Sequence, residues 1–512
     1  MSDTWLTSAF VCGIILLVSA VGYSIHRPSK RWRLPPGPRG IPLLGNIFNI
    51  PDKNEWKAYQ RWSSEYKSDI IHLNMAGTPM IILNSREVSH DLLEKRSAIY
   101  SDRPRYVMLN ELSGFTWDFN FQGYTKEWKD RRKLFTRELQ PPKSLLYRDR
   151  TSKAINNFLH KLINGSADSL VEYLRHMAGE IILSTAYGLQ IKPENDSYIK
   201  LSEVGLTPII KSANWGSYFV DFFPVLKLFP SWLPGMSFKG EAKLWKILSL
   251  NMVQKPFDAV EKQIAAGIPN ISIASASLEA IESEDTAAKI VIRDTLGAMY
   301  EAGADTTVSA LSTFFLAMLL YPEVQKRGRQ AMIQAISNER LPIFSDMQSI
   351  PYVDAIIKEV LRWRPVAPLA LPHRLVADDE YNGYFLPSGS VVVGNSWAIL
   401  HDKSTYGEDV DTFRPERFLR DDQPDPEIPY PDAAFGFGRR MCPGQDMAWS
   451  SMWLTIASVL FLFDVQKATG DDGVPIEPSG KYTSGMQIYP KPFRCTIKLR
   501  SPELASLVLL NE

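Results

Sequence analysis

The sequence predicts a mainly helical protein with small β-sheets, an α+β chain built as one large domain. From about 125 to 345, apolar residues recur at three- and four-residue spacing, which is the period of a helix. Short strand-like runs occur before this region and again near 372–396, and no internal repeat is visible. The chain has 512 residues, of which 45% are hydrophobic and 22% charged, so we expect a large packed core.

The chain starts with an uncharged run of 20 residues, Leu6 to Ile25, which is long enough to span a bilayer as a helix. Basic residues follow it, and the positive-inside rule then puts the rest of the chain in the cytoplasm. A cleaved signal peptide is the alternative, but no basic segment precedes the run. We expect a membrane anchor at 1–26, a stiff basic and proline-rich linker at 27–45, and the main domain at 46–512.

The elements of the main domain follow from local patterns. Residues 69–95 hold two short apolar runs on either side of Gly77, which predicts a hairpin leading into a helix. Strand-like runs return after residue 372, and the last long helix is expected to begin after Gly444. The segment from Trp215 to Gly235 is rich in aromatic residues and prolines. It is either a buried corner or a loop that dips into a membrane interface.

Charge and cysteine content exclude some classes of protein. Lys+Arg and Asp+Glu number 57 each, and this balance argues against a nucleic-acid-binding protein. Three scattered cysteines cannot form a disulfide framework, so the main domain is expected in a reducing compartment. A basic helical stretch at 126–135 is either a solvated face or a site for an anion or partner.

One cysteine, Cys442, lies in a segment rich in glycine and arginine, FGFGRRMCPG from Phe435 to Gly444. A thiolate is a soft, electron-rich ligand for iron, and glycines let the backbone approach a flat cofactor closely. A lone cysteine is more often a small buried hydrophobic residue. Here five fixed positions coincide, and they are Phe435, Gly438, Arg440, Cys442 and Gly444.

This pattern resembles the haem-binding loop of the cytochrome P450 family, the haem-thiolate monooxygenases. The resemblance implies the cytochrome P450 fold and a haem b whose iron is bound by the Cys442 thiolate. It also implies that Phe435, Gly438, Arg440 and Gly444 contact the haem.

A second match is the segment AGADTT, which starts at Ala302 within a helix expected from Asp285 to Leu320. Gly303 in mid-helix costs ~1 kcal/mol relative to alanine, so a flat ligand against a widened turn would explain it. Without the resemblance, Thr306 would bond back to a carbonyl and Asp305 would lie on a solvated face. In the family, Ala302 and Gly303 face the haem, and Asp305 with Thr306 delivers protons to bound dioxygen.

Further motifs extend the resemblance. Glu359 and Arg362 share a helix face, and with Arg417 of the RPERF segment they match the family's structural ion-pair cluster. Haem propionates need cationic partners. The residues that match the family's propionate-binding positions are Trp128, Arg132, His373, Arg374 and Arg440. The remaining basic residues at 126–133 are expected to receive an acidic redox partner.

The resemblance implies NADPH- and dioxygen-dependent hydroxylation, or a related oxidation, of a lipophilic small molecule. The pattern is similar to fungal members that act on secondary metabolites, whether terpenoid, polyketide, steroid-like or aromatic. With only 70 residues after Cys442, electrons are expected from a separate NADPH–cytochrome P450 reductase, with cytochrome b5 as a further candidate partner. We expect single-pass anchoring in the endoplasmic reticulum membrane, with the catalytic domain in the cytoplasm.

The substrate pocket is expected at 107–121, 299–302, 366–371 and 484–488. The aromatic residues Phe115, Trp117, Phe119 and Phe121 either line it or belong to the core. Two other functions are weighed. A reductase-independent haem-thiolate isomerase or dehydratase would not need the acid–alcohol pair. A non-catalytic haem sensor or electron carrier would need neither that pair nor an access channel.

Overall fold

The structure is a computed structural model that describes residues 33–336 and 340–509. The predicted anchor at 1–26 and the first residues of the predicted linker lie outside the described residues. The described part of that linker contains no helix or strand from Arg33 to Gly40. The carbonyl of Pro36 accepts a 2.9 Å hydrogen bond from the His72 N–H, which docks the segment on the first strand.

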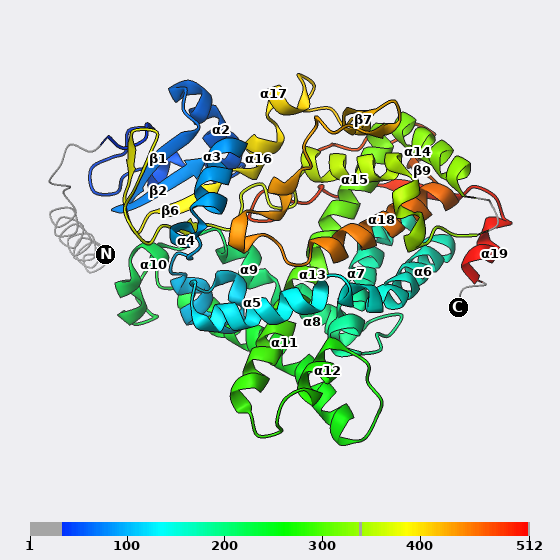
Figure 1. Cartoon of the computed structure of the whole chain (residues 1–512), viewed down its shortest axis with the longest axis horizontal. Coiled ribbons are helices and arrows are strands. Elements are labelled where there is room, and N and C mark those ends of the chain that lie inside the picture. Colours follow the sequence, from blue (N-terminus) through cyan, green and yellow to red (C-terminus); the bar gives the residue numbers. More distant parts are fainter. Residues whose placement is uncertain (1–32, 337–339, 510–512) are drawn as a thin grey trace.

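A four-stranded sheet lies at one end of the molecule, on the left of Figure 1, in the order β1-β2-β6-β3. β1 (Ile70–Met75) and β2 (Thr78–Leu83) form the predicted hairpin, with Ile70 opposite Leu83. The turn residues Ala76 and Gly77 both have positive φ, as in the tight turns that match strand twist. β6 (Val391–Gly394) runs parallel to β2, and β3 (His373–Arg374) pairs with its other edge.

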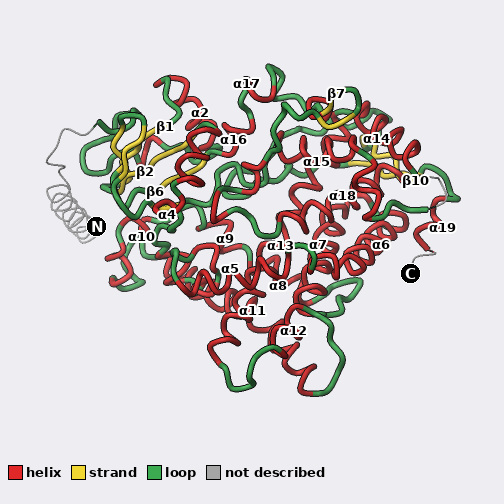
Figure 2. Tube along the Cα trace, in the orientation of Figure 1, coloured by secondary structure: helices red, strands yellow, loops and turns green. Residues whose placement is uncertain are grey.

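Helices form most of the rest of the body, as the red tube in Figure 2 shows. The helical period therefore predicted the region 125–345 correctly. The longer helices are α2 (Glu55–Tyr66), α5 (Lys126–Leu139), α6 (Arg148–Asn164), α7 (Leu170–Tyr187), α8 (Ser197–Gly205), α11 (Phe238–Ala265), α13 (Thr286–Leu320), α14 (Pro322–Ala335), α15 (Pro351–Trp363) and α18 (Gln445–Leu462).

Short elements connect and cover these helices. The short helices are α3 (Arg86–Ser89), α4 (Ser97–Tyr100), α9 (Thr207–Ser212), α10 (Phe219–Phe222), α12 (Ile273–Glu279), α16 (Ser396–Leu400), α17 (Lys403–Tyr406) and α19 (Leu504–Leu509). Two-stranded ribbons pair β4 (Asp379–Tyr381) with β5 (Tyr384–Leu386), β7 (Leu419–Arg420) with β8 (Gln423–Pro424), and β9 (Phe463–Lys467) with β10 (Cys495–Leu499).

α13 is the central helix of the body, and it begins and ends within a residue of the predicted bounds. The Asp285 side chain caps it by accepting a 2.9 Å hydrogen bond from the Ala288 N–H. The helix packs against α5, α7, α11 and α18 and contributes to two separate hydrophobic clusters. Within the described chain it is the one helix long and apolar enough to cross a bilayer, and 78% of that window is buried inside the protein.

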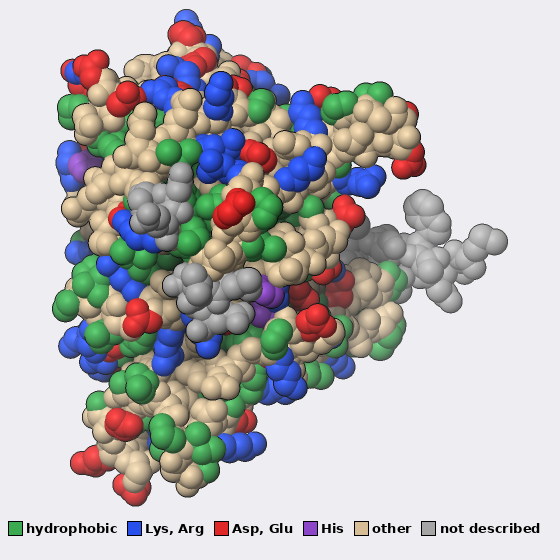
Figure 3. Space-filling view, turned by 90° about the vertical axis from the view of Figure 1, so that its right-hand side faces the viewer, with side chains coloured by type: hydrophobic (Ala, Val, Ile, Leu, Met, Phe, Trp, Pro, Cys, Tyr) green, Lys and Arg blue, Asp and Glu red, His purple; other side chains and the backbone are tan. Residues whose placement is uncertain are grey.

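The aromatic segment 215–235 is buried at one end and exposed at the other. Val220 and Leu226 pack against Trp245 of α11, whereas Leu228 and Trp232 are 75% and 78% exposed. Exposed apolar side chains of this size are typical of surfaces that contact other apolar phases. On the face drawn in Figure 3, basic and acidic side chains are interspersed.

Candidate active site

A cavity inside the body collects most of the sequence motifs. Its walls come from α13, α5, α7, α9, the loop after α15 and the cysteine loop. The predicted site residues that line it are Arg132, Ala302, Gly303, Thr306, His373, Phe435, Arg440, Cys442 and Gly444. These residues are far apart in the chain, so the fold alone brings them together.

The cysteine loop is shaped by backbone hydrogen bonds and by glycines. The Cys442 N–H donates to the Phe435 carbonyl at 2.8 Å, which closes the loop. Gly438 has φ +54°, and a Cβ there would lie 2.1 Å from the Leu93 carbonyl oxygen. Gly438 is thus required by a close approach of two backbone segments. α18 begins two residues after Pro443, as predicted.

Cys442 itself opens onto the cavity. Its side chain is accessible from the cavity, while protein atoms surround it closely on its other sides. Burial therefore raises the pKa of the thiol, while the Gly444 N–H and the Arg132 guanidinium act to lower it. Within residues 33–336 and 340–509 no three His, Cys, Asp or Glu side chains are grouped to hold a metal ion. A lone thiol facing a cavity suits a metal that arrives with its own macrocycle.

Three arginines line the cavity near the cysteine, of which Arg103 and Arg440 are buried and Arg132 is partly buried. Arg103, Arg132 and Arg440 donate mainly to backbone carbonyls, such as those of Ser101 and Met441. Burial lowers the pKa of each guanidinium, and the positive charges of Arg103 and Arg132 lower that of Arg440 further. This excess of buried positive charge fits a ligand with two carboxylates, so the cavity suits the propionates of haem.

The other predicted propionate residues have different surroundings. His373 lines the cavity, and its Nδ1–H donates to the Tyr100 carbonyl at 2.8 Å. Burial holds the pKa of His373 well below its usual range, so the ring is neutral. Arg374 does not line the cavity. It is half exposed and lies 3.5 Å from the Asp102 carboxylate.

Trp128 supports a cavity residue and is not itself part of the wall. The Arg440 guanidinium carbon lies 4.1 Å from its ring centroid, which is a cation–π contact. Tyr124 packs on Trp128 with ring centroids 4.9 Å apart. Tyr124 also accepts a 2.9 Å hydrogen bond from Arg439, the exposed arginine of the cysteine loop.

The residues of the AGADTT motif on α13 do not all face the cavity. Thr306 lines the cavity, and its Oγ1–H donates to the Ala302 carbonyl at 2.8 Å. Asp305 does not line the cavity. Its carboxylate lies 3.4 Å from Arg175 Nε and accepts a hydrogen bond from the Tyr489 hydroxyl. α13 is a continuous α-helix here, and a Cβ at Gly303 would lie 3.0–3.2 Å from Ile182 of α7. No widened turn occurs at this glycine.

The ion-pair cluster is fully buried. Arg362 Nε lies 2.6 Å from one Glu359 oxygen, and Arg417 Nε lies 3.1 Å from both oxygens. The Arg414 N–H also donates to Glu359 at 2.8 Å. Arg362 and Arg417 use their other N–H groups on carbonyls of residues 400–412. The cluster thus ties α15 to the long loop that precedes the cysteine segment.

The rest of the cavity is mostly apolar and holds one carboxyl group. Residues from all four predicted segments and from α9 line it, including Phe121, Met299, Leu371 and Met486. Phe115, Trp117 and Phe119 do not line it, because they are buried in the core beside α13. Two charged lining residues were given no role in the sequence analysis: Arg103, and Glu301 within the predicted segment 299–302. Glu301 directly precedes Ala302, and Arg103 lies in a segment without a periodic pattern.

The basic stretch on α5 is only partly exposed. Lys126, Lys129 and Lys133 are exposed, and with Arg439 they form a basic surface near the cysteine loop. Arg131 is buried, and its Nη2 lies 2.6 Å from the Asp294 carboxylate. Arg131 therefore cannot contact a partner, contrary to the expectation from charge alone.

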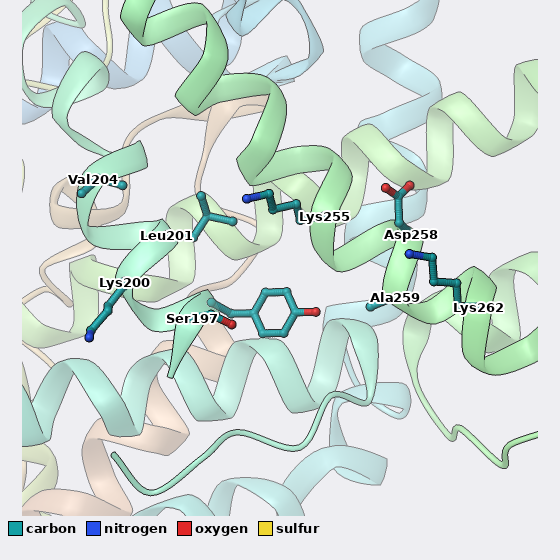
Figure 4. Close-up of a pocket in the computed structure, with 9 residues that line it drawn as sticks. Ser197, Lys200, Leu201, Val204, Lys255, Asp258, Ala259 and Lys262 are labelled. Atoms are coloured by element: carbon teal, nitrogen blue, oxygen red, sulfur yellow. The ribbon is translucent and has the colours of Figure 1, made fainter. Parts of the chain in front are cut away.

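A second pocket is a shallow surface groove between α8 and α11, shown in Figure 4. Lys200, Lys255 and Lys262 project around it, together with Asp258. None of the predicted site residues lines this groove. The predicted site residues that share a pocket do so in the interior cavity.

Comparisons with known proteins agree with this geometry. A family model described as Cytochrome P450 matches residues 35–495. The cytochrome P450 monooxygenase eriA of Hericium erinaceus is 42% identical over 493 residues, covering 94% of this chain and 92% of the relative. The cytochrome P450 monooxygenase ple1 of Rhodocybe pseudopiperita is 39% identical over 97% of this chain and 95% of its own. The tryptamine 4-monooxygenase of Psilocybe cyanescens is 38% identical over 97% and 99%.

Proposed function

Because the chain belongs to the cytochrome P450 family of monooxygenases, we propose that it catalyses the NADPH- and dioxygen-dependent oxidation of a lipophilic small molecule in fungal secondary metabolism. The fungal relatives support this assignment. One of them is named for the 4-oxygenation of tryptamine, which is an indole amine. The mostly apolar lining of the cavity supports a lipophilic substrate.

The observation that carries the proposal is the position of Cys442 in the cavity wall, in the same cavity as the Ala302–Thr307 segment of α13. When bound, haem supplies the iron that activates dioxygen. Cys442 offers that iron its thiolate, since metal binding displaces the thiol proton. Arg103, Arg132 and Arg440 would hold the two propionates and keep the group oriented.

Asp305 and Thr306 act together in proton delivery. The Thr306 hydroxyl lies in the cavity wall, where it can donate a proton or a hydrogen bond to the reacting oxygen. Asp305 lies behind it and pairs with Arg175, whose side chain is 36% exposed. Protons from solvent can therefore reach Asp305 by way of this partly exposed pair, and then pass to Thr306.

The electron donor and the membrane complete the proposal. The basic surface formed by Lys126, Lys129, Lys133 and Arg439 suits an acidic reductase, with cytochrome b5 as a further donor. The exposed side chains of Leu228 and Trp232 support contact with a bilayer. We place the protein on the endoplasmic reticulum membrane, anchored by residues 1–26, with the main domain in the cytoplasm.

The test uses the full chain in microsomes that contain a cytochrome P450 reductase. The reduced protein with carbon monoxide should show a Soret band at the thiolate position, and lipophilic compounds should be oxidised only with NADPH and reductase. Turnover without NADPH and reductase would instead indicate an isomerase or dehydratase. A spectrum without the thiolate signature would refute the haem–Cys442 assignment, and Cys442→Ser provides the matched control for it.

A further inference from the structure

Glu301 is a carboxyl group in the wall of the apolar cavity. It lies on α13 immediately before Ala302, on the same stretch of helix that carries Thr306. Its hydrogen-bond partner in the described chain is the Asn120 side chain, with 3.4 Å between Asn120 Nδ2 and Glu301 Oε2. One long hydrogen bond does not compensate a carboxylate for the loss of water. The proton delivery proposed above does not use Glu301.

A second carboxyl group lies close to the first. Asp118 is fully buried, and its Oδ1 accepts a 2.9 Å hydrogen bond from the Asn120 N–H. Asp118 Oδ2 is buried without a hydrogen-bond partner among the described residues. Burial raises the pKa of Glu301 well above its usual range, and the charge of Asp118 raises it further. Burial likewise raises the pKa of Asp118 to about 7.

The positive charges around this pair leave it one cation short. Arg103 lies near Asp118 and partly offsets its charge, but the N–H groups of Arg103 donate to the carbonyls of residues 120, 371 and 372. Asp294, the carboxylate that precedes Glu301 on α13, has its own partners in Arg131 and Arg293. Arg132 and Arg440 line the same cavity, and the two propionates of the proposed haem would offset two of the three guanidinium charges, so the two carboxyls share the remaining one. They need one further positive charge, and without a substrate a bound proton supplies it.

We propose that Glu301 is the substrate-anchoring residue of the cavity and that it selects lipophilic molecules carrying a cationic nitrogen, such as a protonated amine. This inference rests on the proposed function of the same cavity. The cation replaces the shared proton, and the ion pair forms in an apolar site where charge interactions are strong. A neutral molecule of the same shape leaves the shared proton in place and gains no ion pair, so the site discriminates by charge.

The experiment compares two probes on the haem-loaded full chain by isothermal titration calorimetry. One probe is a phenylbutyl-trimethylammonium salt, which cannot coordinate iron or change charge with pH. The other is its isostere with carbon in place of the quaternary nitrogen. Glu301→Gln should weaken binding of the cation by about ten- to a hundredfold, as for a lost hydrogen-bonded or paired charge. It should change binding of the neutral isostere less than about twofold.

Glu284→Gln, an exposed carboxylate just before α13, is the matched control and should leave both affinities unchanged. An unchanged ratio of the two affinities in Glu301→Gln would overturn the proposal. If this variant does not load haem, the proposal is tested on the unaltered protein by a second measurement. Titrations in buffers of different ionisation enthalpy should detect proton release when the cation binds at pH 7, and none for the isostere. Absence of that difference would equally overturn the proposal.

Failure here is separable from failure of the proposed function. A loaded protein with the thiolate spectrum but no preference for the cation would refute only the role of Glu301. Loss of the thiolate spectrum in the unaltered protein would refute the haem assignment itself.

Discussion

The buried ion-pair cluster provides the sharpest test of how the domain is held together. Replacing Glu359 with glutamine removes one charge and puts an NH2 group against the N–H groups of Arg362 and Arg417. Glu359 and Arg362 are 0% exposed and Arg417 is 5% exposed, so water cannot replace the lost acceptor. Removing one partner of such a pair costs about 3–5 kcal/mol, because buried charges are left uncompensated.

This free energy converts to a shift in thermal midpoint through the entropy of unfolding. For 512 residues at about 2.1 cal/mol/K per residue, that entropy is about 1 kcal/mol/K, so the midpoint should fall by about 3–5 °C. Differential scanning calorimetry at a fixed scan rate measures it, since large proteins often unfold irreversibly. Glu65→Gln is the control, because Glu65 pairs with Arg61 on the surface at 3.3 Å. A shift no larger than in this control would refute the argument.

Three further substitutions test the cavity. Thr306→Ala should increase the oxygen consumed per product several-fold, whereas Thr306→Ser should retain coupling; equal uncoupling in both would contradict the role of the hydroxyl. Arg103→Ala should speed the transfer of haem to apomyoglobin by about tenfold, as for a lost charge-assisted hydrogen bond, and the half-exposed Arg374→Ala should not. Cys442→Ser should abolish the thiolate carbon monoxide spectrum and turnover, because a serine hydroxyl stays protonated; retention of both would show that another residue binds the iron.

Local patterns predicted the architecture well because they depend on neighbouring residues. The bounds of α13, the hairpin at Gly77 and the start of α18 follow from periodicity, a turn signal and a glycine. Motif spacing also located the residues that meet in the cavity, because four of the nine belong to the cysteine loop and three to one stretch of α13.

Tertiary placement accounts for what the sequence could not predict. Arg131 and Arg132 are neighbours on α5 and differ by about 100° around the helix. Arg131 thus meets Asp294, whereas Arg132 faces the cavity. Glu301 and Asn120 meet although 181 residues separate them, and no local signal connects them. Asp305 was expected beside Thr306 as a solvated acid, and its contact with Tyr489 comes from a distant loop.

The contact between Tyr124 and Trp128 has a consequence for electron flow. The two rings lie 4.9 Å apart, between exposed Arg439 on one side and Arg440 in the cavity wall on the other. A reductant docked on the basic surface thus meets conjugated π-systems in contact, where most of the protein wall consists of saturated chain.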